Sequence, residues 1–193
     1  MKKVSYFVML AFAVYALQAC HSSTSTTTTT DSTTKTTDST SKMAADTAKA
    51  DSGDVKFAKT LAGGGMAEIN FSKLTQQKVS AGKLKDFANM MVTDHTKAAD
   101  TLMAIAAKEN ITLPTAMDAD HQTKYDSMQK MSGDDFNKAY VNLMVADHKD
   151  AVNLITNESQ NGKDPALKAF ATKILPTVQG HLDAANKLLA GMK

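Results

Sequence analysis

Four titratable residues lie on rows that are otherwise apolar when the chain is read with helical spacing. His95, His148 and His181 each interrupt such a row, and Glu68 interrupts a fourth. Because residues three and four positions apart share one helix face, we expect each of four helices to direct one of these groups into a core. Three imidazoles and one carboxylate suit zinc, iron or copper. The alternative is a buried hydrogen-bond network that fixes the register of the helices.

Methionine and aspartate neighbours extend this candidate site. Met91 and Met144 lie four residues before the first two of these histidines, on the same predicted helix faces. Their thioethers would favour Cu(I) as ligands, although methionine also fills cores. Asp94 and Asp147 each precede a histidine by one residue, about 100° round the helix, where a carboxylate can orient an imidazole on a neighbouring helix.

The residue inventory excludes several classes of function. Di-iron bundles use inward Glu-x-x-His pairs, whereas neither Glu68, Glu109 nor Glu158 has a histidine three residues later. The chain has no arginine, and its 22 basic residues nearly balance 20 acidic ones. It therefore lacks the positive electrostatic field and the bidentate guanidinium donors that are typical of a nucleic-acid-binding protein. No pattern resembles a nucleophile elbow or a phosphate-binding loop.

Helices are the elements that must position the four groups. Apolar spacings of three and four predict helices at about 54–79, 80–109, 116–131, 132–161 and from Pro165 through Leu188. Ser80 is expected to cap the second helix and Asp164 the last. The glycines at 63–65 should loosen or kink the first helix, and Pro176 should kink the last.

The predicted fold class is all-α. Four long helices form a four-helix bundle in a ferritin-like arrangement, with the short extra helix in the crossover between two antiparallel hairpins. At about 1.5 Å rise per residue, Glu68 and His95 share one height, whereas His148 and His181 are offset by roughly 6 Å. A kink at Pro176 would reduce that offset.

A short internal repeat links the second and fourth helices. Residues 89–95 (NMMVTDH) and 142–148 (NLMVADH) agree at five of seven positions, and each is preceded by an aromatic residue, Phe87 or Tyr140. We therefore expect duplicated hairpins related by an approximate twofold axis.

The first twenty residues resemble the export signal of a bacterial lipoprotein. Two lysines precede an apolar stretch over 4–16, too short to span a bilayer, and Leu17-Gln18-Ala19-Cys20 resembles a lipobox. The resemblance implies cleavage before Cys20, lipidation of its sulfur and anchoring in the cell envelope. His21, rather than aspartate, follows the cysteine, which favours the outer membrane by the enteric sorting convention.

Three regions follow from these patterns. Residues 1–19 are predicted to be a lipoprotein signal peptide, 20–53 a lipidated cysteine with a disordered Ser/Thr-rich tether, and 54–193 the helical domain. The tether has almost no apolar side chain to offset the entropy of ordering.

Several blocks across the helical region resemble a bacterial exported family described as domain of unknown function 4142. They include Phe87-Ala88-x-x-Met91-Val92-x-Asp94-His95, Ser132-Gly133-x-x-Phe136-x-x-x-Tyr140 and Leu175-Pro176-x-x-x-x-His181. The resemblance implies a ferritin-like helical bundle in an exported protein and no established activity.

Three functional hypotheses remain open at this point. The leading one is an envelope-anchored domain without catalysis, in a binding or structural role, either with a transition metal held by the interior Glu/His layer or with that layer as a structural network. The second is a metal-dependent redox or stress-protection enzyme, which needs an open coordination position and a route for a small substrate. The third is a scaffold whose protein partners bind its outer faces.

Overall fold

The structure, a computed structural model, describes residues 51–192. It contains five helices over that range: α1 (Ser52–Lys78), α2 (Lys83–Lys108), α3 (Ala119–Gln129), α4 (Gly133–Asn161) and α5 (Pro165–Ala190), with no strand among these residues. The predicted all-α class is confirmed. The predicted signal peptide, Cys20 and most of the predicted tether lie outside the described residues.

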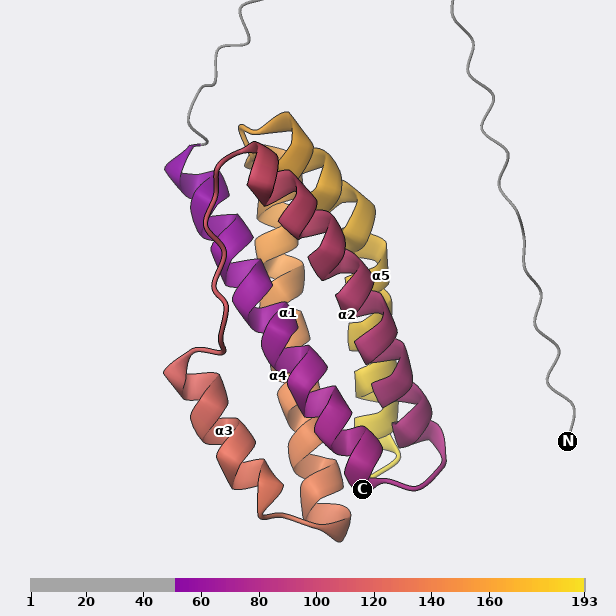
Figure 1. The fold of residues 1–193 in the computed structure, drawn as a ribbon. Helices are drawn as coiled ribbons and strands as arrows, with labels where there is room; N and C mark the ends of the chain where they lie inside the picture. The colour runs from indigo at the N-terminus through magenta and orange to yellow at the C-terminus, as the bar shows by residue number, and fades with distance from the viewer. Residues whose placement is uncertain (1–50, 193) are drawn as a thin grey trace, which may run out of the picture. The chain divides into compact units, whose positions relative to one another are not determined.

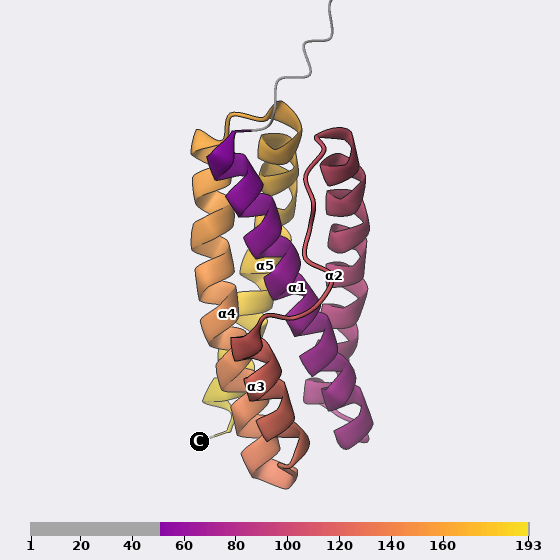
Figure 2. The same ribbon diagram turned by 60° about the vertical axis from the view of Figure 1, so that its left-hand side comes forward.

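The four long helices form a bundle, and α3 lies outside it (Figure 1). Short turns join α1 to α2 and α4 to α5, so each pair is an antiparallel hairpin. Because α2 ends at one end of the bundle and α4 begins at the other, the crossover runs along the bundle before entering α3 (Figure 2). There α3 packs against α1 and α4.

The local sequence explains where the helices begin. Asp164 accepts a hydrogen bond from the Leu167 backbone N–H, and Pro165 takes the first turn of α5, as predicted. The predicted cap at Ser80 is wrong. The cap position is Gly82, whose φ of 95° favours glycine, and no side chain caps α2.

The run of glycines at 63–65 does not interrupt α1, contrary to the sequence-based prediction. Glycine costs a helix up to about 1 kcal/mol per residue relative to alanine, but packing outweighs this here. A Cβ on Gly63 would lie 3.8 Å from Pro114 Cγ of the crossover, and one on Gly65 would lie 3.8 Å from His95 Nδ1. Both distances are ordinary van der Waals contacts, and a Cβ on Gly64 would meet no atom within 4 Å, so the helix continues through the glycines without a steric demand for them.

A buried carboxylate ties the start of α1 to the α4–α5 turn. Asp54 accepts hydrogen bonds from the backbone N–H groups of Lys163 (3.0 Å) and Asp164 (2.7 Å). Glu158 is buried beside it, and burial, together with the charge of Asp54, raises the pKa of Glu158 to about 7. This end of the bundle is thus fixed by polar contacts.

The apolar core consists of two clusters. The first, named here the Phe136 cluster, fills one half of the bundle, and the second, the Phe170 cluster, fills the other. The Phe136 cluster includes Phe71, Leu84, Phe87, Met91, Phe136, Tyr140 and Met144. The Phe170 cluster includes Phe57, Leu102, Ile155, Leu167, Phe170 and Val178. Near the boundary between the two clusters, each long helix carries one buried histidine or glutamate: Glu68, His95, His148 or His181.

The repeated segments of α2 and α4 lie at diagonal corners of the bundle. Each of these helices packs against both α1 and α5, and the rings of Phe87 and Tyr140 meet edge to face with centroids 6.1 Å apart. Both helices run in the same direction (Figure 1). A twofold axis that exchanges them also exchanges α1 with α5, so the repeat does not superpose one hairpin on the other in chain order.

Candidate metal centre

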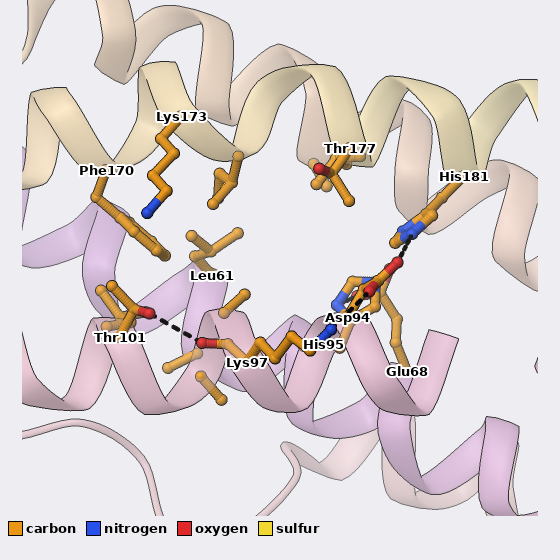
Figure 3. Close-up of a pocket in the computed structure, with 18 residues that line it drawn as sticks. Leu61, Glu68, Asp94, His95, Lys97, Thr101, Phe170, Lys173, Thr177 and His181 are labelled. Carbon is orange, nitrogen blue, oxygen red and sulfur yellow. Dashed lines mark hydrogen bonds and ion pairs between the residues drawn. The ribbon is translucent and has the colours of Figure 1, made fainter. Parts of the chain in front are cut away.

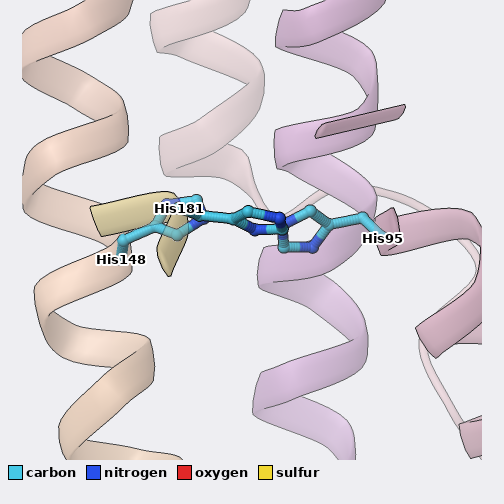
Figure 4. A group of neighbouring side chains, drawn as sticks. All are labelled: His95, His148 and His181. Atoms are coloured by element: carbon cyan, nitrogen blue, oxygen red, sulfur yellow. The ribbon is translucent and has the colours of Figure 1, made fainter. Parts of the chain in front are cut away.

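Glu68, His95, His148 and His181 come together in the layer between the two apolar clusters (Figures 3 and 4). All four are buried, with exposed fractions from 0% for His148 to 9% for His95. The three imidazole centroids lie 5.2, 5.4 and 5.5 Å apart. One ligand atom from each histidine lies within 4.8 Å of the others, which is close enough to share one ion.

The predicted offset between His148 and His181 along the bundle does not keep their rings apart, since the ring centroids lie 5.5 Å from each other. Counting residues from the turn ignores the direction in which helical side chains lean. Side chains tilt toward the N-terminus of their own helix. In the antiparallel α4–α5 pair, His148 therefore leans away from the turn and His181 leans toward it, which closes the gap.

Glu68 lies behind two of the imidazoles. Its Oε2 is 3.2 Å from His95 Nδ1, and its Oε1 is 3.1 Å from His148 Nδ1. The Met144 carbonyl oxygen lies 2.9 Å from the same His148 nitrogen. A carbonyl only accepts hydrogen bonds, so His148 Nδ1 carries the proton. Nε2 of neutral His148 then has a lone pair.

The third imidazole is held from the neighbouring helix. His181 Nε2 lies 3.1 Å from Asp94 Oδ2 (Figure 3), in the orienting position considered for Asp94 from the sequence. The repeat-equivalent Asp147 contacts none of the three clustered imidazoles among the described residues. Its Oδ2 is 3.9 Å from His121 Nε2, and its charge contributes to the raised pKa of Glu68.

Each clustered imidazole has one further nitrogen that is buried and unpaired. Within residues 51–192, His95 Nε2, His148 Nε2 and His181 Nδ1 have no hydrogen-bond partner. The opposite nitrogens of His148 and His181 face the Met144 carbonyl and the Asp94 carboxylate, so His148 Nε2 and His181 Nδ1 present lone pairs, and His95 Nε2 is the third unpaired nitrogen. Three buried ring nitrogens without a partner, on histidines close enough to share one ion, form a donor set suited to a metal.

The electrostatics keep these ligands neutral. Burial and the neighbouring imidazoles lower the pKa of His95 to about 3, and burial with His181 lowers that of His148 to about 4. Burial also lowers the pKa of His181, partly offset by Asp94. Burial raises the pKa of Glu68 well above its usual range. The short Glu68–imidazole contacts therefore join neutral groups and are not ion pairs.

The two methionines considered as ligands are fully buried in the Phe136 cluster. Met144 contacts the layer through its backbone carbonyl. His121, given little functional weight from the sequence, lies at the start of α3, where Asp118 caps the helix and contacts the ring at 2.6 Å.

Two cavities flank the layer, and neither was foreseen from the sequence. The first, the α2–α5 cavity, has a volume of about 310 Å³ and reaches Glu68, His95 and His181 (Figure 3). The second, the crossover cavity, has a volume of about 950 Å³ and lies between α1, α4 and residues 112–121. It reaches Glu68 from the opposite side. The glycines at 63–65 are the sequence feature that could have indicated these cavities. All three line the crossover cavity, and Gly65 lines both cavities.

These features define a helical bundle with a buried three-histidine cluster. The sequence profile of the family described as "Domain of unknown function (DUF4142)" matches residues 39–188, and the chain belongs to this family. No curated protein matches the chain. No helix within residues 51–192 combines the length and apolar character needed to cross a membrane.

Two solved structures share the fold. One is a crystal structure of a DUF305 fragment from Deinococcus radiodurans, with a TM-score of 0.65 and 11% identity, covering 73% of this chain and 97% of that one. The other is "CopM in the Cu(I)-bound form", with a TM-score of 0.60 and 15% identity, covering 72% of this chain and 96% of that one. At such identities the similarity concerns the fold alone.

Proposed function

We propose that this protein is an envelope-anchored lipoprotein whose helical bundle binds one transition-metal ion through His95, His148 and His181. The observation that carries the proposal is the set of three buried, unpaired imidazole nitrogens around one centre. Glu68 and Asp94 act as orienting residues, because Glu68 Oε2 lies 3.2 Å from His95 Nδ1 and Asp94 Oδ2 lies 3.1 Å from His181 Nε2, each at the ring nitrogen opposite the unpaired one.

A purely structural hydrogen-bond network explains the layer less well. In such a network each buried polar atom has a hydrogen-bond partner, whereas a buried acceptor left unpaired destabilises the fold by about 1–3 kcal/mol. Three such acceptors would each lower the stability of the folded protein. A cation bound by all three would remove this destabilisation. The contacts of Glu68 and Asp94 are common to both interpretations, so the unpaired nitrogens favour the metal.

Among zinc, iron and copper, Cu(I) is the ion that we propose. Neutral imidazole nitrogens suit both Cu(I) and Zn(II). The layer lies between two apolar clusters, where the cost of burying an ion rises steeply with its charge. Burying the monocation Cu(I) beside the single buried carboxyl of Glu68 therefore costs less free energy than burying a divalent ion. A copper-bound protein of the same fold supports testing copper first.

Metal titration of the mature chain, purified without a histidine tag, tests this proposal. We expect one Cu(I) per chain, measured by competition with a chromophoric Cu(I) chelator, and weaker binding of Zn(II) and Fe(II). His95→Asn combined with His148→Asn should abolish stoichiometric binding, with circular dichroism confirming the fold. His121→Asn is the matched control, since that imidazole is outside the cluster. Weak binding that is equal in all three proteins would refute the site.

The membrane anchor is tested separately. The lipobox-like segment ending in Cys20 supports lipidation, and the expected location is the outer membrane. Radiolabelled palmitate should label the native protein and leave a Cys20→Ser variant unlabelled. Density-gradient fractionation should place the native protein with the outer membrane. Labelling that is unaffected by the substitution would contradict the proposed anchor.

A further inference from the structure

The α2–α5 cavity leads from the surface to the imidazole layer. Its inner end is formed by Glu68, His95 and His181, and its outer part by side chains of α2 and α5. Its walls are largely apolar and include Leu61, Leu102, Phe170, Ile174 and Val178. A volume of about 310 Å³ is at the lower end of the range of small-molecule sites.

The cluster offers three protein donors, one fewer than a closed tetrahedral site requires. Structural metal sites are usually closed by four protein ligands, whereas sites that exchange ligands have three and an open position. Among the histidines, cysteines, aspartates and glutamates of the described residues, the group that can share one ion consists of the three histidines. An ion held by these three imidazoles can therefore accept a fourth ligand from outside.

The two cavities differ in what they can deliver. The α2–α5 cavity is lined by two of the three imidazoles. The crossover cavity, as far as the described residues show, meets the layer only at Glu68, whose carboxyl group lies behind the rings of His95 and His148. The open position can thus be approached from the α2–α5 side, while Glu68 blocks the other.

We propose that the metal centre takes a small, weakly hydrated monoanion as its fourth ligand, which enters through the α2–α5 cavity. This inference rests on the proposed metal site. Lys97 and Lys173 line the cavity (Figure 3); Lys97 Nζ lies 3.9 Å from Asp94 Oδ1, which lines the cavity too, and Lys173 adds a positive charge that no carboxylate of the described residues pairs with. The apolar walls disfavour strongly hydrated ions, because entry requires loss of the hydration shell. Coordination alone is involved, and no bond within the ligand breaks.

Thiocyanate is the probe, because its C≡N stretch shifts on coordination and is read by infrared spectroscopy. The anaerobic, Cu(I)-loaded mature chain should show a shifted band that saturates at one thiocyanate per copper. Ala98→Phe and Thr177→Phe place a ring on opposite walls of the cavity and should weaken thiocyanate binding at least about tenfold by filling it. Ala104→Phe, on the same helix but outside the cavity lining, and Gly64→Phe, in the crossover cavity, are the matched controls and should change nothing.

The lysines are tested with a charged and a neutral probe. Lys97→Gln combined with Lys173→Gln should weaken thiocyanate binding about 2- to 10-fold, since both charges are solvent-screened. Binding of carbon monoxide, also read by its infrared stretch, should be unchanged.

The outcomes separate this inference from the metal site. A chain that binds no metal refutes both. A chain that binds one copper but shows no shifted thiocyanate band, or binds thiocyanate equally well with Phe at 98 and 177, keeps its metal site and overturns the open position or the route. Equal losses for both probes in the lysine variant would overturn the anion preference.

Discussion

Replacing Asp94 tests most directly whether the carboxylate behind His181 prepares that ring for a metal. The Asp94–His181 contact is 3.1 Å. Adding the width of an imidazole and a metal–nitrogen bond of about 2 Å places a bound cation roughly 6–7 Å from the carboxylate. At an effective dielectric constant of about 20–40, suited to a partly exposed group, the attraction for a monocation is about 1–2.5 kcal/mol.

We therefore expect Asp94→Asn, which keeps an acceptor but loses the charge, to weaken Cu(I) binding by roughly 10- to 50-fold. Asp94→Ala also removes the acceptor for His181 Nε2, releases the ring to its other tautomer, and should weaken binding further. The assay is chelator competition at constant pH and ionic strength.

The repeat supplies the control for this experiment. Asp147 is the sequence equivalent of Asp94, yet its nearest imidazole contact in the described structure is His121 at 3.9 Å. Asp147→Asn should change Cu(I) affinity less than about threefold, since no ligand ring depends on it. Equal effects at Asp94 and Asp147 would show that general charge, and not ring orientation, governs affinity, and would refute the reasoning.

Three further predictions concern stability. The folded pKa of Glu158, about 7, lies above its ordinary value of 4.5, so folding stability is full below about pH 4.5 and falls as the pH rises to about 7. Glu158→Gln should therefore stabilise the protein at pH 8 relative to pH 4.5 by about 2–3 kcal/mol in urea unfolding, and equal effects at both pH values would contradict the raised pKa. Gly64→Ala should stabilise α1 by up to about 1 kcal/mol, because the added Cβ meets no atom within 4 Å. Gly82→Ala should destabilise the protein, because alanine disfavours the φ of 95°. Destabilisation by Gly64→Ala and stabilisation by Gly82→Ala in thermal unfolding would refute the backbone argument. Saturating Cu(I) at 100 times its Kd should raise the free energy of unfolding by about 2.7 kcal/mol, and the histidine double variant should show no rise.

The rows of apolar residues were sufficient to predict the bundle and the inward direction of all four polar groups. Helical period and burial are linked through local geometry, so His95, His148 and His181 could be placed on core faces from spacing alone. The position of the His181 ring along the bundle could not be predicted from spacing. It depends on the direction in which side chains lean in an antiparallel helix pair and on the tilt of the helices. The predicted cap at Ser80 failed for a related reason, since the turn is completed by the positive φ of Gly82.

The chemistry of the site was less accessible from sequence. From the sequence, Glu68 and the three histidines were all candidate metal ligands with no difference in role. Only the structure shows that the carboxyl oxygens of Glu68 lie against the Nδ1 atoms of two rings. The repeat suggested equal roles for Asp94 and Asp147, but their surroundings differ because α5 offers an imidazole where α1 offers Glu68. Cavities depend on how neighbouring helices diverge, which apolar spacing does not encode.

The polar layer draws one group from each of four helices that are far apart along the chain. No hairpin alone carries the complete donor set, since α1–α2 supplies one imidazole and α4–α5 supplies two. Metal capture at this centre is therefore possible only after both hairpins have docked in the correct register. A one-residue slip would turn a ligand about 100° away from the centre. If the proposed ion binds here, its binding would report that both hairpins have docked in register.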